Sequence, residues 1–196
     1  MPIRNVRQQK IELRARYKKI RKECPPEIKS RLHKKISDRF LGLEEYTSCK
    51  TLFTFVSSDI EVDTIYIIEK ALSDGKQVAV PKCTDKTGHM EFYYINSLNE
   101  LKTGYFSILE PDTNICKKAD SFTGLCIVPG LCFDYQGFRI GFGKGYYDRF
   151  LQRFKGTTVG ICYSKCIEKE LPKGAYDRSV DILVTDKFTI QNINKE

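Results

Sequence analysis

The chain has 196 residues, of which 41% are hydrophobic and 30% charged, and its formal net charge at pH 7 is +8. This composition excludes a disordered chain and is typical of one soluble globular domain, which we expect to cover residues 1–196. No apolar run approaches the roughly 20 residues that a membrane-spanning helix needs, and the N-terminus has no apolar secretory segment, so we expect a cytoplasmic protein without a membrane partner.

The positive charge is concentrated at the N-terminus. Residues 1–22 contain nine Lys and Arg residues and one acid, Glu12, which accounts for the whole excess because the remainder has 24 residues of each sign. Three interpretations stay open: a solvated helix face, a face that binds a partner or polyanion, and a mitochondrial presequence. The absence of serine from this segment weakens the third interpretation.

Eight cysteines are present, but no two are separated by the two residues of a zinc or redox motif. Several lie within apolar runs, such as Cys126 and Cys162. We therefore expect reduced thiols in the core rather than disulfides.

The first 42 residues predict two helices. Residues 5–23 form a helix whose apolar stripe repeats at helical spacing and consists of Val6, Leu13, Tyr17, Ile20 and Cys24. Lys10 and Arg14 project from one side of this helix, next to the stripe, so a docked helix would aim both cations into a cleft; two solvated charges are the alternative. Pro25 and Pro26 end this helix and start a second, which runs to a C-cap at Gly42. His33, on the second helix, is assigned no role.

A strand–helix–strand unit follows, consisting of a strand at 50–57, a helix from 65 to 75 and a strand at 77–81. Asp63 or Thr64 could cap the helix. The order predicts a parallel crossover unit, and ligands of such sheets bind beyond the carboxyl ends of the strands. Glu61 lies in one such loop, although an exposed capping acid is the alternative.

The remainder predicts further strands and one irregular stretch. We expect an edge strand or hairpin arm at 89–95, a short helix at 96–103, a surface loop at 104–124, a central strand at 125–128, and strands at 157–163 and 182–185.

Residues 128–151 carry the strongest motif. An apolar run ends in Pro129-Gly130, a polar turn follows at 134–137, and glycines then alternate at 141, 143 and 145 before a helix that begins at Tyr146. Glycines let a backbone approach a ligand and present its N–H groups to it, and Lys144 among them suits a phosphate. Asp148, one turn into the helix, could hold a metal. The motif predicts a nucleotide phosphate site, with a tight turn as the alternative.

Common nucleotide and nucleophile motifs are excluded. Phe138 occupies the place of the first Walker A glycine, and Tyr146 that of the third dinucleotide-fingerprint glycine. The chain has no His-Arg-Asp or Asp-Phe-Gly kinase motif and no Gly-x-Ser-x-Gly elbow.

The motif instead resembles the signature of the 5-formyltetrahydrofolate cyclo-ligase family, which is also called 5,10-methenyltetrahydrofolate synthetase. The matching positions are Pro129, Gly130, Leu131, Phe133, Asp134, Gly137, Arg139, Gly141, Gly143, Gly145, Tyr146, Tyr147 and Asp148. Three further segments resemble the family's other motifs: Lys10-x-x-Leu13-Arg14, Glu61-Val62-Asp63-Thr64 and Asp177-x-x-x-Asp181.

The resemblance implies an α/β fold: a three-layer α/β/α sandwich with a Rossmann-like, mostly parallel sheet and helices on both faces. It implies an ATP- and Mg²⁺-dependent ligase of one-carbon metabolism. This enzyme would convert 5-formyltetrahydrofolate to 5,10-methenyltetrahydrofolate by phosphorylation of the formyl oxygen and ring closure by N10.

The resemblance also implies roles for individual residues. ATP would be bound by Lys10, Arg14, Arg139, Ile140, Gly141, Phe142, Gly143, Lys144, Gly145, Tyr146 and Tyr147. The folate substrate would be bound by Val56, Glu61, Phe142, Gly143, Lys144, Gly145 and Tyr146. The groups acting in catalysis would be Lys144, Arg139 and Tyr146, and the Mg²⁺ ligands would be Asp148 and Asp177.

Two positions depart from the family pattern. Phe142 stands where the family usually has arginine, and phenylalanine cannot grip a phosphate bidentately. Tyr176 stands where a histidine is common before the second metal aspartate.

Three alternatives stay open: another ATP-dependent small-molecule enzyme on this scaffold, a basic nucleic-acid-binding module, and a structural glycine motif in an inactive protein. We expect a monomer that binds small molecules. We expect no nucleic-acid partner, because charge outside the first helix is balanced.

Overall fold

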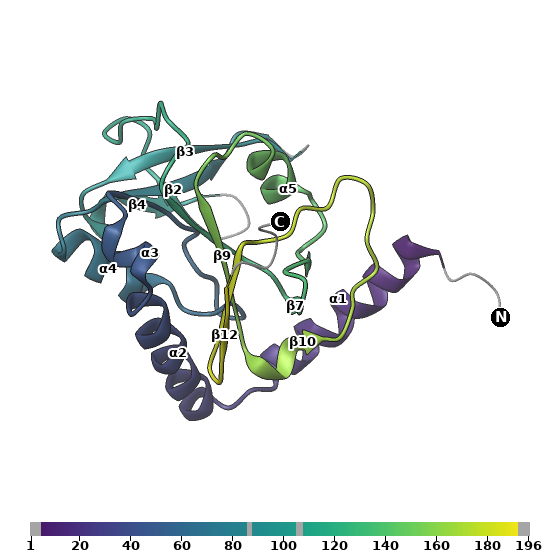
Figure 1. The fold of residues 1–196 in the computed structure, drawn as a ribbon. Helices are drawn as coiled ribbons and strands as arrows, with labels where there is room; N and C mark the ends of the chain where they lie inside the picture. Colours follow the sequence, from purple (N-terminus) through teal and green to yellow (C-terminus); the bar gives the residue numbers. More distant parts are fainter. Residues whose placement is uncertain (1–4, 86–87, 105–107, 192–196) are drawn as a thin grey trace.

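In the computed structural model, which describes residues 5–85, 88–104 and 108–191, a seven-stranded sheet forms the centre of the molecule (Figure 1). Its strands, in spatial order, are β12 (Thr189–Ile190), β11 (Ile182–Thr185), β9 (Thr157–Cys162), β6 (Leu125–Val128), β1 (Thr51–Phe53), β2 (Gln77–Cys83) and β3 (Met90–Ile95). The four inner pairs are parallel, and β3 and β12 join the two edges antiparallel. The predicted crossover unit, central strand and edge strand are confirmed.

Helices lie on both faces of this sheet. Figure 1 shows α2 (Pro26–Leu41) and α4 (Ile65–Ser73) on one side and α5 (Tyr146–Leu151) on the other. On the α5 side, the Phe150 ring packs against Phe53 and Phe92, with ring centroids 6.1 and 4.4 Å apart. Burying such rings is a large favourable term in folding. The predicted three-layer, mostly parallel α/β fold is confirmed.

Helix α1 (Val6–Lys22) lies outside the main sheet, against a second sheet of three strands. These strands are β10 (Ile167–Glu168), β7 (Cys132–Asp134) and β8 (Arg139–Ile140). The Tyr17 hydroxyl donates to Glu168 across 2.7 Å, and the Arg14 Nε donates to the Gly141 carbonyl across 3.0 Å. The stripe of α1 packs as predicted through Tyr17 and Cys24, whereas Val6 at its start is 40% exposed.

Several predicted boundaries are wrong. The strand expected at 50–57 ends at Phe53, because the chain then leaves the sheet and the Ser57 N–H donates to the Thr64 hydroxyl across 3.1 Å. The helix expected at 96–103 is one 3₁₀ turn, η1 (Leu98–Glu100), followed by strand β4 (Leu101–Thr103), which pairs with β5 (Leu109–Pro111). The loop expected at 104–124 therefore contains a strand, and its residues 105–107 lie outside the described part.

Some elements were not predicted. The turn at 134–137 joins β7 and β8 as a hairpin, and a short helix, α3 (Glu44–Ser48), follows α2. The Thr64 side chain makes no cap for α4; the Asp63 Oδ1 accepts from the Ile65 N–H across 2.9 Å instead. All eight cysteines are free, as expected, and six of them are buried.

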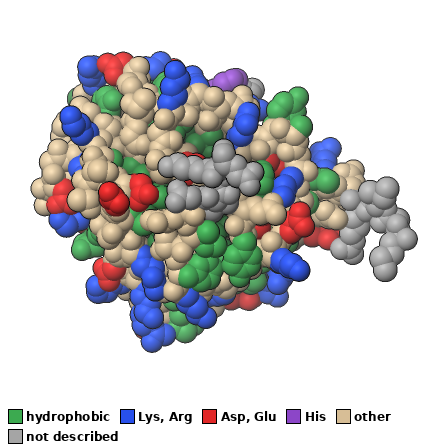
Figure 2. Space-filling model, viewed as in Figure 1, with side chains coloured by type: hydrophobic (Ala, Val, Ile, Leu, Met, Phe, Trp, Pro, Cys, Tyr) green, Lys and Arg blue, Asp and Glu red, His purple; other side chains and the backbone are tan. Residues whose placement is uncertain are grey.

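Among the described residues, no helix combines the length and the apolar character needed to cross a membrane. Figure 2 shows basic groups at several separate places on the visible face, interrupted by acidic and uncharged side chains.

Candidate functional site

A cavity of about 510 Å³ lies between α1, the segment after β1, the ends of β2 and β3, and the glycine loop between β8 and α5. Every residue that sequence analysis assigned to the site lines it: Lys10, Arg14, Val56, Glu61, Arg139, Ile140, Gly141, Phe142, Gly143, Lys144, Gly145, Tyr146, Tyr147, Asp148 and Asp177. The structure thus brings these residues together, while their individual roles stay predictions.

The glycine loop has the backbone that its sequence predicts. Gly143 and Gly145 have φ angles of 99° and 72°, in the left-handed region where a side chain is strained. Gly141 is different, because its φ is ordinary and a Cβ there would meet nothing within 4 Å. Glycine is therefore required by conformation at two positions, and the third faces open space.

Two cations of α1 reach this loop. The Arg14 guanidinium lies over Gly143, where a Cβ would come within 3.2 Å of the Arg14 Cζ, while the Arg14 Nε donates to the Gly141 carbonyl. The Lys10 ammonium pairs with Asp177. Docking of α1 therefore places both predicted cations in the cavity.

Each predicted metal ligand is held by a cation through one oxygen. The Asp148 Oδ1 lies 2.9 Å from Nη2 of Arg139, whose side chain is only 4% exposed. The Asp177 Oδ2 accepts from Lys10 and, across 2.7 Å, from the Gly174 N–H. The other oxygen of each carboxylate accepts no hydrogen bond within the described part of the chain.

No group of three or more His, Cys, Asp or Glu residues in the described ranges forms a metal site. Two single carboxylate oxygens fit Mg²⁺ nevertheless, since this ion usually takes one or two carboxylates and completes its shell with water and substrate phosphates. The donor set therefore fits a metal that arrives with a nucleotide.

The opposite wall contains Glu61, which is 7% exposed. Its Oε2 accepts from the Ser58 N–H across 2.9 Å and from the Ser58 hydroxyl across 2.7 Å, and Oε1 accepts no hydrogen bond from the described residues. Burial raises the pKa of Glu61 above its ordinary value, although the bonds from Ser58 oppose this shift. One carboxylate oxygen is therefore free to accept hydrogen bonds from a ligand.

The two adjacent tyrosines differ in their hydroxyl partners. The Tyr146 hydroxyl donates to the Asp85 carbonyl across 2.7 Å, and burial raises the pKa of Tyr146 to about 12. The Tyr147 hydroxyl is buried and has no hydrogen-bond partner among the described residues, and burial raises the pKa of Tyr147 well above its ordinary value. An unpaired buried hydroxyl beside a cavity can bond to a ligand or to an ordered water.

Sequence analysis missed several lining residues, including Lys18, Ser58 and Cys83. Lys18 follows Lys10 and Arg14 at four-residue spacing, and extending that pattern would have found it. Its ammonium lies 5.4 Å from the ring centre of Phe142, so a cation is present at the position where the glycine motif lacks its usual arginine. Cys83 ends β2, so the rule on carboxyl ends of parallel strands points to it.

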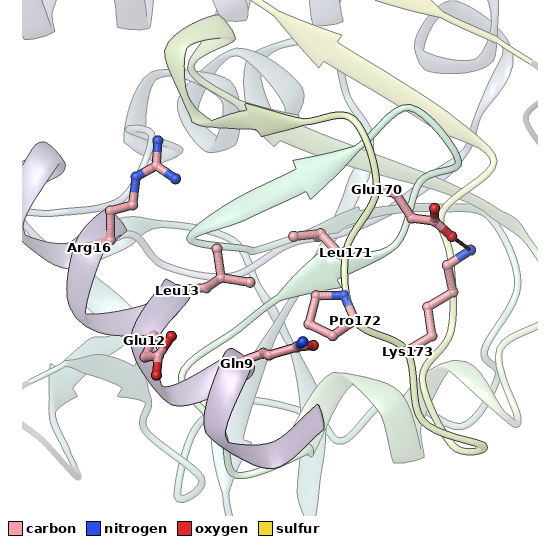
Figure 3. Close-up of a pocket in the computed structure, with 8 residues that line it drawn as sticks. All are labelled: Gln9, Glu12, Leu13, Arg16, Glu170, Leu171, Pro172 and Lys173. Atoms are coloured by element: carbon pink, nitrogen blue, oxygen red, sulfur yellow. Dashed lines mark ion pairs between the residues drawn. The ribbon is translucent and has the colours of Figure 1, made fainter. Parts of the chain in front are cut away.

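A second hollow, of about 780 Å³, lies against a different face of α1 (Figure 3). It is lined by Gln9, Glu12, Leu13, Arg16, Glu170, Leu171, Pro172 and Lys173. Leu13, Leu171 and Pro172 form its apolar part, and Lys173 pairs with Glu170 across 3.5 Å. No residue assigned to the site lines it.

Comparison with known proteins identifies the family. The model of the 5-formyltetrahydrofolate cyclo-ligase family matches residues 6–186. A probable 5-formyltetrahydrofolate cyclo-ligase of Schizosaccharomyces pombe is 33% identical over 175 residues, which cover 81% of this chain and 85% of the relative. The mouse 5-formyltetrahydrofolate cyclo-ligase is 29% identical, with 86% and 89% covered.

Solved structures agree with this match. The 5,10-methenyltetrahydrofolate synthetase of Aquifex aeolicus superposes with a TM-score of 0.82 at 32% identity, covering 95% of this chain and 94% of the other. A 5,10-methenyltetrahydrofolate synthetase of Mycoplasma pneumoniae shares the fold, with a TM-score of 0.69 at 23% identity over 91% and 99% of the two chains. The chain therefore belongs to the 5-formyltetrahydrofolate cyclo-ligase family and is an enzyme of the ligase class.

Proposed function

We propose that this protein converts 5-formyltetrahydrofolate, with ATP and Mg²⁺, to 5,10-methenyltetrahydrofolate, ADP and phosphate. One observation carries the proposal: cations, half-engaged carboxylates and the buried Glu61 face a single cavity. This arrangement provides one end for polyphosphate and another for a ligand rich in hydrogen-bond donors, such as a pterin. Residues 1–196 would work as one domain.

The reaction requires activation of a poor leaving group. The formyl oxygen would attack the γ-phosphorus of ATP, and ADP would leave, giving an imidate phosphate. N10 would then attack the former formyl carbon and lose its proton, and phosphate would leave as the ring closes. No protein nucleophile is needed, so the protein's tasks are positioning and charge neutralisation.

The cavity residues suit these tasks in different ways. Lys144 makes no ion pair with any described residue, so its ammonium is free to contact a phosphate. Arg14 and Lys10 add positive charge from α1, and Asp148 and Asp177 would hold Mg²⁺, which supplies charge stabilisation at the phosphates. Arg139 already donates to Asp148 and, across 2.6 Å, to the Arg178 carbonyl, so we assign it to fixing Asp148 rather than to gripping phosphate.

The folate substrate would occupy the end near Glu61 and Val56. The carboxylate accepts hydrogen bonds through its unpaired Oε1, and Val56, which is 4% exposed, provides apolar contact. Tyr146 and the glycine loop would then lie where folate and ATP meet.

The test is direct. Purified protein is mixed with 5-formyltetrahydrofolate, ATP and Mg²⁺, and the absorbance of the methenyl product is followed. We expect product only with all three present. A folded protein that forms none would overturn the proposal.

One alternative is another ATP-dependent small-molecule enzyme on the same scaffold. It predicts ATP hydrolysis that responds to a different small molecule and not to formylfolate. Salt-dependent binding to nucleic acid would favour the other alternative. A monomeric state and a cytoplasmic location stay predictions, testable by sedimentation and by imaging of the tagged protein.

A further inference from the structure

The loop that carries Glu61 is held from behind through three consecutive carbonyl groups. The Asp59 carbonyl accepts from the Lys29 ammonium of α2. The Ile60 carbonyl accepts from Nη1 of Arg21 on α1 across 3.1 Å. The Glu61 carbonyl accepts from the hydroxyl of Tyr163, which follows β9, across 3.2 Å. Three elements distant in sequence thus fix one short segment of the cavity wall.

Arg21 joins this loop to the segment that leads into the glycine motif. Its guanidinium donates to the carbonyls of Gly130, across 2.5 Å, and Leu131, across 3.0 Å, in addition to Ile60. The side chain is 1% exposed, its Nη2 also lies 3.4 Å from the Cys162 Sγ, and no carboxylate among the described residues pairs with it. Burying a guanidinium without a carboxylate partner costs desolvation free energy. A contribution to folding stability alone therefore does not explain why Arg21 is buried here.

Tyr163 is fully buried and is held on two sides. The Arg21 guanidinium lies 5.2 Å from its ring centre, and the His33 ring stacks on it with centroids 5.7 Å apart. The His33 Nε2 lies 2.5 Å from the Tyr163 hydroxyl. Which of these two groups donates depends on the His33 tautomer; we assign the proton to His33 Nε2, which then donates to the Tyr163 oxygen and leaves the hydroxyl proton for the Glu61 carbonyl. The hydroxyl is therefore fixed in direction as well as position.

We propose that Arg21 and Tyr163 are positioning residues that hold Glu61 for the folate substrate. This inference rests on the function proposed above, in which Glu61 accepts hydrogen bonds from the pterin. The α1 cations that would bind ATP have anchors of their own, since Arg14 bonds to the Gly141 carbonyl and Lys10 pairs with Asp177. A change that loosens the Glu61 loop should therefore weaken the binding of formylfolate more than the binding of ATP.

The Tyr163→Phe variant tests this, because it removes one hydroxyl and keeps the ring. We expect the KM for 5-formyltetrahydrofolate to rise about fivefold, which corresponds to one lost hydrogen bond of about 1 kcal/mol. The KM for ATP should stay within about twofold. Tyr46→Phe is the matched control: Tyr46 is 4% exposed, its hydroxyl donates to Asp74 across 2.7 Å, and it does not line the cavity.

A double-mutant cycle separates positioning from general stability. In a Glu61→Gln background, Tyr163→Phe should change formylfolate binding much less than in the wild type, since the carboxylate that it positions is gone. Thermal stabilisation by 5-formyltetrahydrofolate gives the same comparison where turnover is too slow to measure. Arg21→Lys should also raise the KM for formylfolate, because a point charge cannot serve the carbonyls of both segments that the guanidinium now holds.

Three results would overturn the inference: equal changes in both KM values, an unchanged effect in the Glu61→Gln background, or a Tyr163→Phe variant that behaves like Tyr46→Phe. If Arg21→Lys fails to fold, the KM values and the double-mutant cycle of Tyr163→Phe alone test the inference. A wild-type protein that makes no methenyl product would instead refute the proposed function, which keeps the two failures distinct.

Discussion

The two hollows beside α1 differ more in chemistry than in shape. The hollow next to residues 170–173 is the larger, about 780 Å³ against about 510 Å³, yet its charged side chains are engaged with each other or with nearby strands. Arg16 pairs with Glu168 across 3.0 Å, and Lys173 pairs with Glu170. In the smaller cavity, Lys18 and Lys144 lack a carboxylate partner within the described residues.

This difference teaches that side chains without an ion-pair or hydrogen-bond partner identify a candidate site better than the volume of a hollow does. The smaller cavity holds cations without counterions among the described residues, carboxylates with one oxygen that accepts no hydrogen bond there, and the buried Tyr147 hydroxyl without a partner there. Of these groups, the buried hydroxyl is the costly one when no ligand or water completes it. In the larger hollow both cations that line it, Arg16 and Lys173, have a carboxylate partner, so we interpret it as a surface groove. The comparison leads to four tests.

The largest effect is expected for Asp148→Asn in the smaller cavity. Asparagine retains an oxygen for Arg139, so the fold should survive, but the negative charge that would hold Mg²⁺ is lost. Because metal stabilisation of phosphoryl transfer is worth several kcal/mol, we expect kcat to fall at least about 100-fold. Turnover at saturating substrates and a melting curve measure the two effects. Wild-type turnover would refute the metal role of Asp148.

A second test compares two faces of one helix. Arg14→Met removes a charged group from the cavity, and we expect the KM for ATP to rise about 10- to 100-fold, since hydrogen bonds to charged groups contribute roughly 1.5–3 kcal/mol. Arg16→Met, two residues along, removes a half-exposed ion pair beside the groove and should leave this KM within about twofold. Equal effects of the two variants would remove the distinction between the hollows.

Tyr147→Phe should change stability and binding in opposite directions. It removes a buried hydroxyl that has no partner among the residues at 5–85, 88–104 and 108–191. Such a group costs about 1–3 kcal/mol, so the free protein should melt a few degrees higher. The rise in Tm caused by saturating ATP and formylfolate together should shrink, because the bond made on binding is lost. A lower Tm for the free variant would show that the hydroxyl already has a partner, such as water.

The smallest effect is expected in the larger hollow. The double variant Gln9→Ala and Glu170→Gln alters its rim without touching the core, and such surface changes usually stay within about 0.5 kcal/mol of stability. We expect turnover and Tm to match the wild type. A tenfold fall in kcat/KM for either substrate would make the groove part of the functional surface.

Much of the fold could be predicted because its main elements have clear periodic patterns. The central strand at 125–128 is apolar at every position, and the helix that begins at Tyr146 follows residues that cannot extend a strand. The errors arose where tertiary contacts decide. Residues 55–57 have strand composition but leave the sheet, and residues 101–103 form a strand because 109–111 pair with them.

The site divides in the same way. Cations at helical spacing and glycines at alternate positions are visible in the sequence, so Lys10, Arg14 and Gly143 could be predicted. Arg21 and Tyr163 could not, since each acts through backbone carbonyls of remote segments, and a carbonyl accepts bonds whatever residue carries it. The ion pair between Asp148 and Arg139 could not be predicted either, because it depends on a distance in the folded chain that no sequence spacing gives.

The attachment of α1 has a consequence for synthesis. The contact between Lys10 and Asp177 joins residues 167 positions apart, and that between Arg14 and Gly141 joins residues 127 apart. A chain emerging from the ribosome exposes its basic first helix long before the partners of that helix exist. The contact between Lys10 and Asp177 therefore forms only after residue 177 has emerged, so this side of the cavity is completed late in synthesis.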